Sequence, residues 1–327
     1  MSRSRVLIAA LISSLAPNFA AADEGGVSFW LPGQFASLAA TPAQPGWAFA
    51  GIYYHTSVDA GGGRAFASGG QIRAGLDARA DLVFLNATYV SPNPVFGAQA
   101  AFGLTGAFGR MRASIEATLT GPGGGVLSGS RTDTLFGVAD LFPMATLKWN
   151  RGVHNYMTYL TGNIPVGSYS PSRLANTGIG HAAIDSGVGY TYFDPTKGHE
   201  FSVVTGFTHN FENSDTNYQN GIDWHLDWAA SQFLSKQTHV GVVGYLYNQL
   251  TGDSGAGATL GPIHSRVAGI GPQIGYIFPA GHMQGYLNLK GYYEFAAQHR
   301  PEGWNVWVTL AFSPPAPHDP AKPKTTK

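Results

Sequence analysis

The stretch RMRASIEATLT, residues 110–120, alternates strictly between two kinds of side chain. Its odd-numbered positions are all apolar: Met111, Ala113, Ile115, Ala117 and Leu119. Its even-numbered positions are all polar or charged: Arg110, Arg112, Ser114, Glu116, Thr118 and Thr120. Because successive side chains of a β-strand point to opposite faces, the pattern predicts a strand whose two faces meet different surroundings.

Long alternating runs recur along the chain, as in THVGVVGYLYNQL at 238–250 and QGYLNLKGYYEF at 284–295. A soluble β-sandwich also alternates, but its strands average about five or six residues. A transmembrane strand needs about 9–11 residues and carries aromatic side chains at the two membrane interfaces. Only a closed barrel satisfies every backbone hydrogen bond of such strands in lipid. The sequence therefore predicts an all-β fold, a transmembrane antiparallel up-and-down β-barrel.

The pattern gives about 12 strands, and division of a long segment would give about 14. The strands are expected near residues 46–57, 71–91, 96–120, 134–150, 154–165, 180–193, 199–211, 221–235, 238–251, 264–278, 283–297 and 303–312. Long Gly-rich connections alternate with short turns in this assignment. Since bacterial barrels have short periplasmic turns and longer outer loops, we expect the long connections outside the cell and both termini in the periplasm.

The N-terminus predicts a secretory signal peptide over residues 1–22. Arg3 and Arg5 precede an apolar run that is too short to span a bilayer, and Ala20 and Ala22 form a cleavage pattern of small residues. Residues 23–45 then form either a periplasmic lead-in or a luminal plug. The barrel is expected over 46–312, and the Pro- and Lys-rich residues 313–327 are expected to be a disordered periplasmic tail.

Composition excludes several classes of function. The formal net charge is zero, which gives no general attraction to nucleic acid. There is no cysteine, so disulfides, thiol catalysis and cysteine metal sites are excluded. No nucleotide or redox motif is visible, and GDSG at 252–255 reads as an ordinary turn in a Gly-rich loop. We expect a protein that is not an enzyme and has no cofactor.

The alternation assigns candidate side chains to the lumen. On the opening stretch we expect Met111, Ile115 and Leu119 to face lipid. Arg110, Arg112 and Glu116 are then expected to face a watery lumen. On the strand near 221–235, three side chains share the luminal face: Asp223, His225 and Asp227. This spacing is compatible with a metal ion, but polar lining of the lumen is the favoured interpretation.

Aromatic side chains on the expected luminal face suggest a path for flat apolar solutes, since rings offer stacking and burial. They are Tyr245, Tyr247, Tyr286, Tyr292 and Trp307. The alternative is that these rings fill the lumen of a closed structural barrel.

Several stretches resemble the outer-membrane transporter family named for the meta-pathway of phenol degradation. They are EGGVSFWLPGQFASL at 24–38, PGWAFAGIYYH at 45–55, SRLANTGIGH at 172–181, FENSDTNYQNGIDWHLDWA at 211–229 and GYLYNQLTGDSGAGATLGPIHSRVAGIGPQIGY at 244–276. The resemblance covers nearly all of the chain after residue 22 and defines no catalytic site.

The resemblance implies a porin-like barrel in the outer membrane of a Gram-negative bacterium, reached after cleavage of a Sec-type signal peptide. Its expected partners are outer-membrane lipid and a small hydrophobic or aromatic solute that passes without energy input. A barrel with a structural or lipid-hydrolase role is the alternative. The identity of the solute, the openness of the lumen and the oligomeric state stay open.

Overall fold

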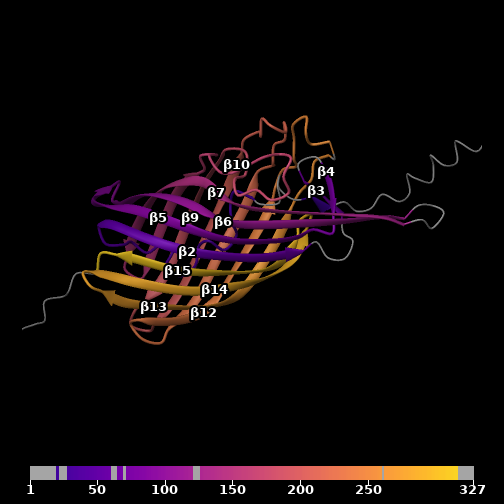
Figure 1. Ribbon diagram of the computed structural model, residues 1–327. Coiled ribbons are helices and arrows are strands. Elements are labelled where there is room, and N and C mark those ends of the chain that lie inside the picture. The colour runs from indigo at the N-terminus through magenta and orange to yellow at the C-terminus, as the bar shows by residue number, and fades with distance from the viewer. Residues whose placement is uncertain are drawn as a thin grey trace, which may run out of the picture.

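The protein folds into a closed antiparallel barrel (Figure 1). The structure, a computed structural model, describes residues 20–21, 28–59, 65–68, 71–120, 126–259 and 261–315. Within these residues the barrel strands are β2 (Gly46–Asp59), β5 (Asp77–Val95), β6 (Ala98–Thr120), β7 (Val126–Arg151), β8 (His154–Gly162), β9 (Ala183–Asp194), β10 (His199–Asn210), β11 (Asp223–Phe233), β12 (Thr238–Gln249), β13 (Arg266–Ala280), β14 (Met283–Gln298) and β15 (Glu302–Ser313).

Each barrel strand pairs with the next along the chain, and β15 pairs with β2 to close the cylinder. The predicted all-β fold and the count of twelve barrel strands are confirmed. The prediction of one strand over 71–91 is wrong in part, because β4 (Gln71–Ala74) pairs with β3 (Ala65–Ser68) outside the barrel. Gly75 separates β4 from β5 with a φ of +58°, a left-handed conformation that interrupts an extended strand.

A short strand, β1 (Ala20–Ala21), pairs in parallel with β3 and completes a small three-stranded sheet. The remainder of the expected signal peptide lies outside the described residues, as do residues 316–327 of the expected tail. Among the described residues, no helix is long and apolar enough to cross a membrane.

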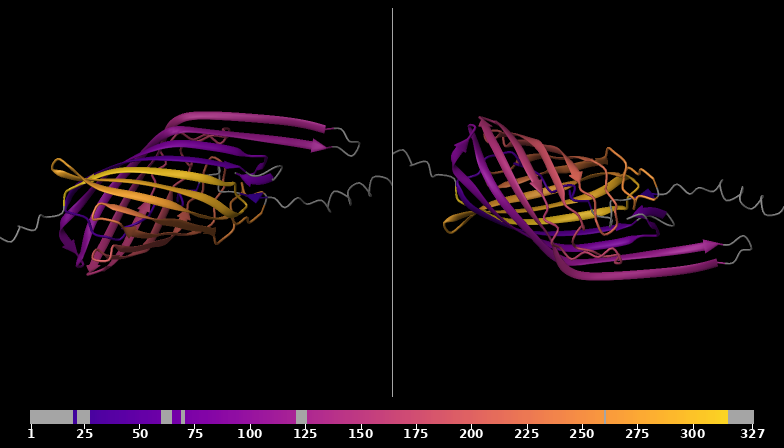
Figure 2. Two further views of the ribbon diagram at one scale, coloured as in Figure 1. Left: turned by 90° about the horizontal axis from the view of Figure 1, so that it is seen from below. Right: turned by 90° about the horizontal axis from the view of Figure 1, so that it is seen from above.

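The two ends of the barrel differ. One end carries the turns at 96–97, 152–153, 195–198, 234–237 and 281–282. We call it the turn end. The other, the loop end, carries the longer connections and the short one at 299–301. At the loop end the hairpin of β6 and β7 projects beyond its neighbours (Figure 2).

Side chains alternate between lumen and surface as the sequence predicts on most strands. Leu289 is 46% exposed on the outer surface, whereas its neighbour Asn288 is buried. Other exposed apolar side chains surround the barrel, among them Phe102, Leu160, Val188, Phe207, Leu246 and Leu310. These side chains give the barrel an outer surface suited to hydrocarbon.

The orientation expected for residues 110–120 is wrong. Met111 packs against the luminal hydrophobic cluster, and Ala113 is buried with Leu174 and Ala175. Arg110 and Arg112 are exposed on the outer face, as is Glu116. The side chain of residue 119 lies outside those described. The physical reason is that the connection between β8 and β9 supplies apolar side chains to the lumen here, so the apolar face of the strand turns inward.

Candidate functional site

Residues 28–45 run inside the barrel, against side chains that line its lumen. Trp30 is 1% exposed and stacks on His225 with ring centroids 3.5 Å apart. Phe29 contacts Phe142 of β7, with centroids at 6.1 Å. Gly33 adopts a φ of +85°, and a Cβ there would meet the Tyr292 ring at 2.8 Å. Both the turn and the close approach therefore require glycine.

Two oppositely charged side chains hold the middle of this luminal segment. Asp227 accepts hydrogen bonds from the backbone N–H of Gly33 at 2.8 Å and of Phe35 at 3.1 Å. The Lys290 ammonium donates to the carbonyl of Gly33 at 2.6 Å and to that of Gln34 at 3.1 Å. The charges of the wall are thus satisfied by backbone groups that would otherwise be buried without partners.

Further anchors hold the rest of the luminal segment. Glu200 accepts from the Ser37 hydroxyl at 2.7 Å and from the backbone of Leu38 at 3.0 Å. Lys148 donates to two carbonyl oxygens of the segment, at 2.7 and 3.2 Å. Gln99 bonds both the N–H and the C=O of Ala43. The segment is therefore fixed to the wall along its length.

The three candidates on β11 all face the lumen, and each has a protein partner. Asp223 accepts from the Asn210 amide at 2.8 Å. His225 Nε2 lies 2.8 Å from Asp185 Oδ2, with both side chains fully buried, and Asp227 holds the luminal segment. In the part of the chain that the structure describes, no group of three or more His, Asp or Glu side chains is arranged to hold a metal ion.

The five aromatic candidates also face inward, but they pack against protein. Tyr245 and Tyr292 contact each other with centroids at 4.9 Å, and the Tyr292 hydroxyl donates to the Gly33 carbonyl. Trp307 packs on Tyr54 at 4.4 Å. Tyr247 lies under the Arg300 guanidinium at 4.8 Å.

Tyr286 lies apart from this cluster, where its hydroxyl bonds His239 at 3.0 Å. The other four rings are each at most 4% exposed. They are therefore enclosed by other protein groups and leave no ring face open to a solute, and Tyr245 and Tyr292 lie beneath Gly33 of the luminal segment.

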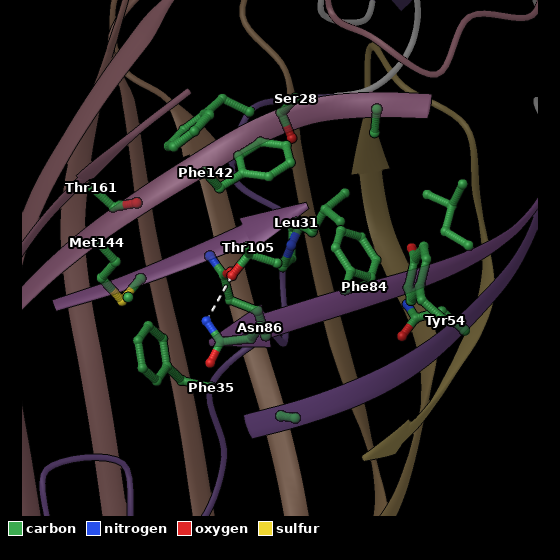
Figure 3. A pocket seen from close by; sticks show the side chains of 18 of the residues that line it. Ser28, Leu31, Phe35, Tyr54, Phe84, Asn86, Thr105, Phe142, Met144 and Thr161 are labelled. Carbon is green, nitrogen blue, oxygen red and sulfur yellow. Dashed lines mark hydrogen bonds between the residues drawn. The ribbon is translucent and has the colours of Figure 1, made fainter. Parts of the chain in front are cut away.

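A cavity of about 480 Å³ lies on the other side of the luminal segment, against β2, β5, β6 and β7. Figure 3 shows Leu31 and Phe35 of the segment beside Phe84, Asn86 and Thr105 of the wall. The wall side chains are mainly apolar and include Tyr54, Leu82, Phe84, Met111, Phe142, Met144 and Met157.

The cavity reaches from one end of the barrel to the other. Its lining includes Val58 and Arg300 at the loop end, and Gln99 and Lys148 at the turn end. None of the eleven residues that the sequence singled out contributes to this lining. Those residues are Tyr245, Tyr247, Tyr286, Tyr292, Trp307, Arg110, Arg112, Glu116, Asp223, His225 and Asp227.

One polar ladder interrupts the apolar wall. The Thr88 hydroxyl donates to the Asn86 carbonyl oxygen at 2.9 Å, and the Asn86 amide donates to the Thr105 hydroxyl at 2.9 Å. Thr105 retains its own O–H proton, because its oxygen serves as the acceptor in this contact. The ladder therefore presents a hydroxyl donor to an otherwise apolar space.

The fold and the cavity can be set beside known proteins. Residues 61–310 match the family described as "Putative MetA-pathway of phenol degradation". The chain belongs to this family. No curated protein matches the sequence.

Among solved structures, the chain is similar to an outer-membrane channel from Pseudomonas putida F1. The TM-score is 0.62 and the sequence identity is 14%, over 84% of this chain and 96% of that chain. This likeness shows the shared fold.

Two further structures resemble the chain more weakly. A FadL homologue from Pseudomonas aeruginosa gives a TM-score of 0.36 at 9% identity, over 82% of this chain and 88% of that chain. A bacterial polysaccharide outer-membrane secretin gives 0.34 at 12% identity, over 83% and 98%. Both scores are too low to carry an argument.

Proposed function

We propose that the protein is an outer-membrane channel for passive passage of small hydrophobic or aromatic compounds. The observation that carries the proposal is the apolar cavity that runs the length of the barrel beside the luminal segment. Its volume falls within the range of about 300–1,000 Å³ typical of small-molecule sites. The phenol-degradation description of the family and the outer-membrane channel of similar fold support the same function.

The proposed path enters near Arg300 at the loop end and leaves near Lys148 at the turn end. A charged solute would lose its hydration in the apolar middle, which is costly without a paired charge. An apolar solute gains from burial of its surface against Phe84, Phe142 and Met144. The lining thus favours neutral apolar solutes.

The polar ladder refines this preference. A solute that carries one hydroxyl group can accept from the Thr105 hydroxyl while its ring contacts Phe35 or Phe84. A hydrocarbon makes only the apolar contacts. We therefore assign the path to small neutral compounds and expect hydroxylated aromatic ones to bind better than their unsubstituted analogues.

The same proposal includes the processing and orientation of the chain. Residues 1–22 are removed as a signal peptide, the turn end faces the periplasm, and residues 313–327 extend from that end. The luminal segment, within residues 23–45, narrows the lumen and forms one wall of the path. Its many anchors support a fixed wall that stays in place during passage.

A matched pair of substitutions on β6 tests the path. Thr105→Trp should fill the cavity and lower phenol influx into liposomes, because residue 105 lines the lumen. Leu104, one residue away, is 47% exposed on the outer surface, so Leu104→Trp should leave influx unchanged. Equal influx through both folded variants would show that solutes do not use this cavity.

A further inference from the structure

The outer face of the β7–β8 hairpin changes character toward the turn end of the barrel. Leu160 of β8, which lies away from the turn, is aliphatic and 56% exposed. Four residues nearer the turn, Tyr156 pairs directly with Trp149 of β7. The next outward pair, at the turn itself, joins His154 with Arg151. We call Trp149, Arg151, His154 and Tyr156 the interfacial cluster.

This order of side chains matches the layers of a bilayer. Trp and Tyr are enriched at the boundary between hydrocarbon and headgroups, so the Trp149–Tyr156 pair marks that boundary. Arg151 and His154 each lie two residues beyond the pair along their own strands. At about 3.4 Å per residue and a tilt of about 40°, two residues rise about 5 Å. The headgroup layer is about 5–7 Å thick on each side of a bilayer, so Arg151 and His154 lie within it.

The surrounding chain does not balance the positive charge of Arg151. Neither residues 82–115 nor residues 141–184 contain an Asp or a Glu, so β6, β7 and β8 supply no carboxylate near the turn end. Asp194, at the end of β9, is occupied by the Thr196 hydroxyl at 2.6 Å and by Lys197 at 3.8 Å. Among the residues that the structure describes, no carboxylate oxygen lies within 4 Å of Arg151. The turn end of this hairpin therefore carries a net positive charge.

Two rings of the interfacial cluster are held in place by β9. His154 Nδ1 lies 2.7 Å from the Tyr190 hydroxyl, and the two rings stack with centroids 6.0 Å apart. When Nδ1 accepts from this hydroxyl, Nε2 carries the proton and is a donor for another group. The Tyr156 ring also packs on Tyr190, with centroids 5.5 Å apart, and Tyr156 stays 46% exposed. The cluster thus presents donors at two depths of the membrane interface.

We propose that the interfacial cluster binds the headgroup of a phospholipid, with the phosphodiester group on Arg151. A guanidinium group pairs with two phosphate oxygens through parallel hydrogen bonds, and His154 Nε2 donates to the same group. The ester carbonyl oxygens of a phospholipid lie between its phosphate and its acyl chains, at the level of Tyr156. The acyl chains then run along the exposed Leu160 and Val188. This inference goes beyond the proposed function and does not depend on the solute that passes.

Binding of dioleoylphosphatidylglycerol to the purified full-length protein, measured by native mass spectrometry, tests the site. Arg151→Ser should weaken binding roughly ten- to a hundredfold, because a charge-assisted contact is lost. Lys236→Ser is the matched control and should keep the parent affinity, because Lys236 is an exposed cation in the turn 234–237 at the same end of the barrel. Unchanged affinity in Arg151→Ser, or an equal loss in the control, overturns the proposal.

Two conservative variants test the geometry of the site. Arg151→Lys keeps the charge but loses the bidentate pairing, so it should bind several-fold more weakly than the parent, and it serves if the serine variant does not fold. Tyr156→Phe keeps the ring but loses one hydroxyl, and should also bind several-fold more weakly. Tyr89→Phe is its control, because Tyr89 of β5 is 40% exposed and lies outside the cluster. Parent affinity in both Arg151→Lys and Tyr156→Phe would reduce the effect to general charge attraction and overturn the assigned site.

Two further probes identify the chemical group that is recognised. Dioleoylglycerol keeps the chains and the esters but lacks the phosphate, and should bind the parent no better than it binds Arg151→Ser. If it binds the parent as tightly as the phospholipid does, the phosphate is not recognised. If inorganic phosphate at equal concentration displaces the phospholipid, the cluster binds a free anion and the lipid assignment is wrong.

Discussion

Removal of the charged anchors at the middle of the luminal segment should widen the channel. The double change Asp227→Ala, Lys290→Met removes both members of an oppositely charged set, so no unpaired charge is left buried. It also removes four hydrogen bonds to the segment. The carbonyl of Gly33 keeps the Tyr292 hydroxyl as donor, whereas Gly33 N, Phe35 N and Gln34 O lose the partner described above.

The free-energy cost of the double change follows from these three backbone groups. A buried polar group left without a partner costs about 1–3 kcal/mol, so the three together cost about 3–9 kcal/mol while the segment stays against the wall. That penalty is relieved when water enters or when residues 28–36 leave the wall. Glu200, Lys148 and Gln99 still hold residues 37–43, so we expect partial detachment rather than loss of the whole segment.

Single-channel conductance in planar bilayers and the swelling of liposomes in arabinose measure the change. The double variant should show a larger conductance and a new leak of the sugar. Asp223→Ala is the control, because Asp223 lies four residues from Asp227 on the same luminal face and bonds Asn210 of the wall. If the folded double variant conducts no more than the parent and the control, the luminal segment does not set the width of the channel.

Three further predictions follow from the same geometry. Leu289→Arg should lower the free energy of unfolding by about 2–4 kcal/mol, measured by urea titration in lipid vesicles. Leu250→Arg should lower it by less, because residue 250 lies at the loop end where headgroups and water begin. Equal losses would contradict the assigned membrane depth. The double variant Asn86→Leu, Thr105→Val should lower the ratio of phenol flux to toluene flux by roughly fivefold to tenfold, because phenol loses about one hydrogen bond. An unchanged ratio would show that the polar ladder does not contribute to selectivity. Gly33→Ala should disturb the luminal segment, because its Cβ would lie 2.8 Å from the Tyr292 ring and residue 33 has a φ of +85°. Limited proteolysis of the segment measures this disturbance, and cleavage slower than in the parent would refute it.

The fold could be predicted from the sequence because strand alternation is a local signal. The period of two survives at nearly every position of the barrel, and the lengths of the connections give the number of strands. The exception is instructive. Residues 110–116 alternate as well as any others, but their charged face points outward and their apolar face inward.

Alternation alone cannot say which face is which. That depends on what lies on each side, and here Leu174 and Ala175 fill the lumen while the outer face carries polar groups. Both facts belong to tertiary structure. The position of the strand relative to the exposed apolar side chains of the outer surface would have been needed to choose correctly.

The candidate site was harder to predict for a related reason. In a narrow barrel, a buried charge or ring on the luminal face indicates contact with something, and here that partner is the luminal segment of the same chain. Asp227 and Lys290 bind its backbone, and Tyr245 and Tyr292 pack beneath Gly33. Chemically prominent side chains therefore mark the occupied half of the lumen.

The position of the open half of the lumen follows from the volumes of the inward-facing side chains. The inward positions that line the cavity from β2, β5, β6 and β7 are often small: Ala48, Ala50, Ala78, Ala80, Ala101, Gly103 and Ala139. The inward positions of β11, β12 and β14 are often large: His225, Tyr245, Tyr247, Lys290 and Tyr292. The barrel wall is closed, and its inward side chains are larger on one side than on the other. Once the luminal segment packs against the side with the large side chains, the free space in the lumen must lie on the opposite side. A comparison of inward side-chain volumes along successive strands would thus locate the path in a barrel of this kind better than its aromatic content does.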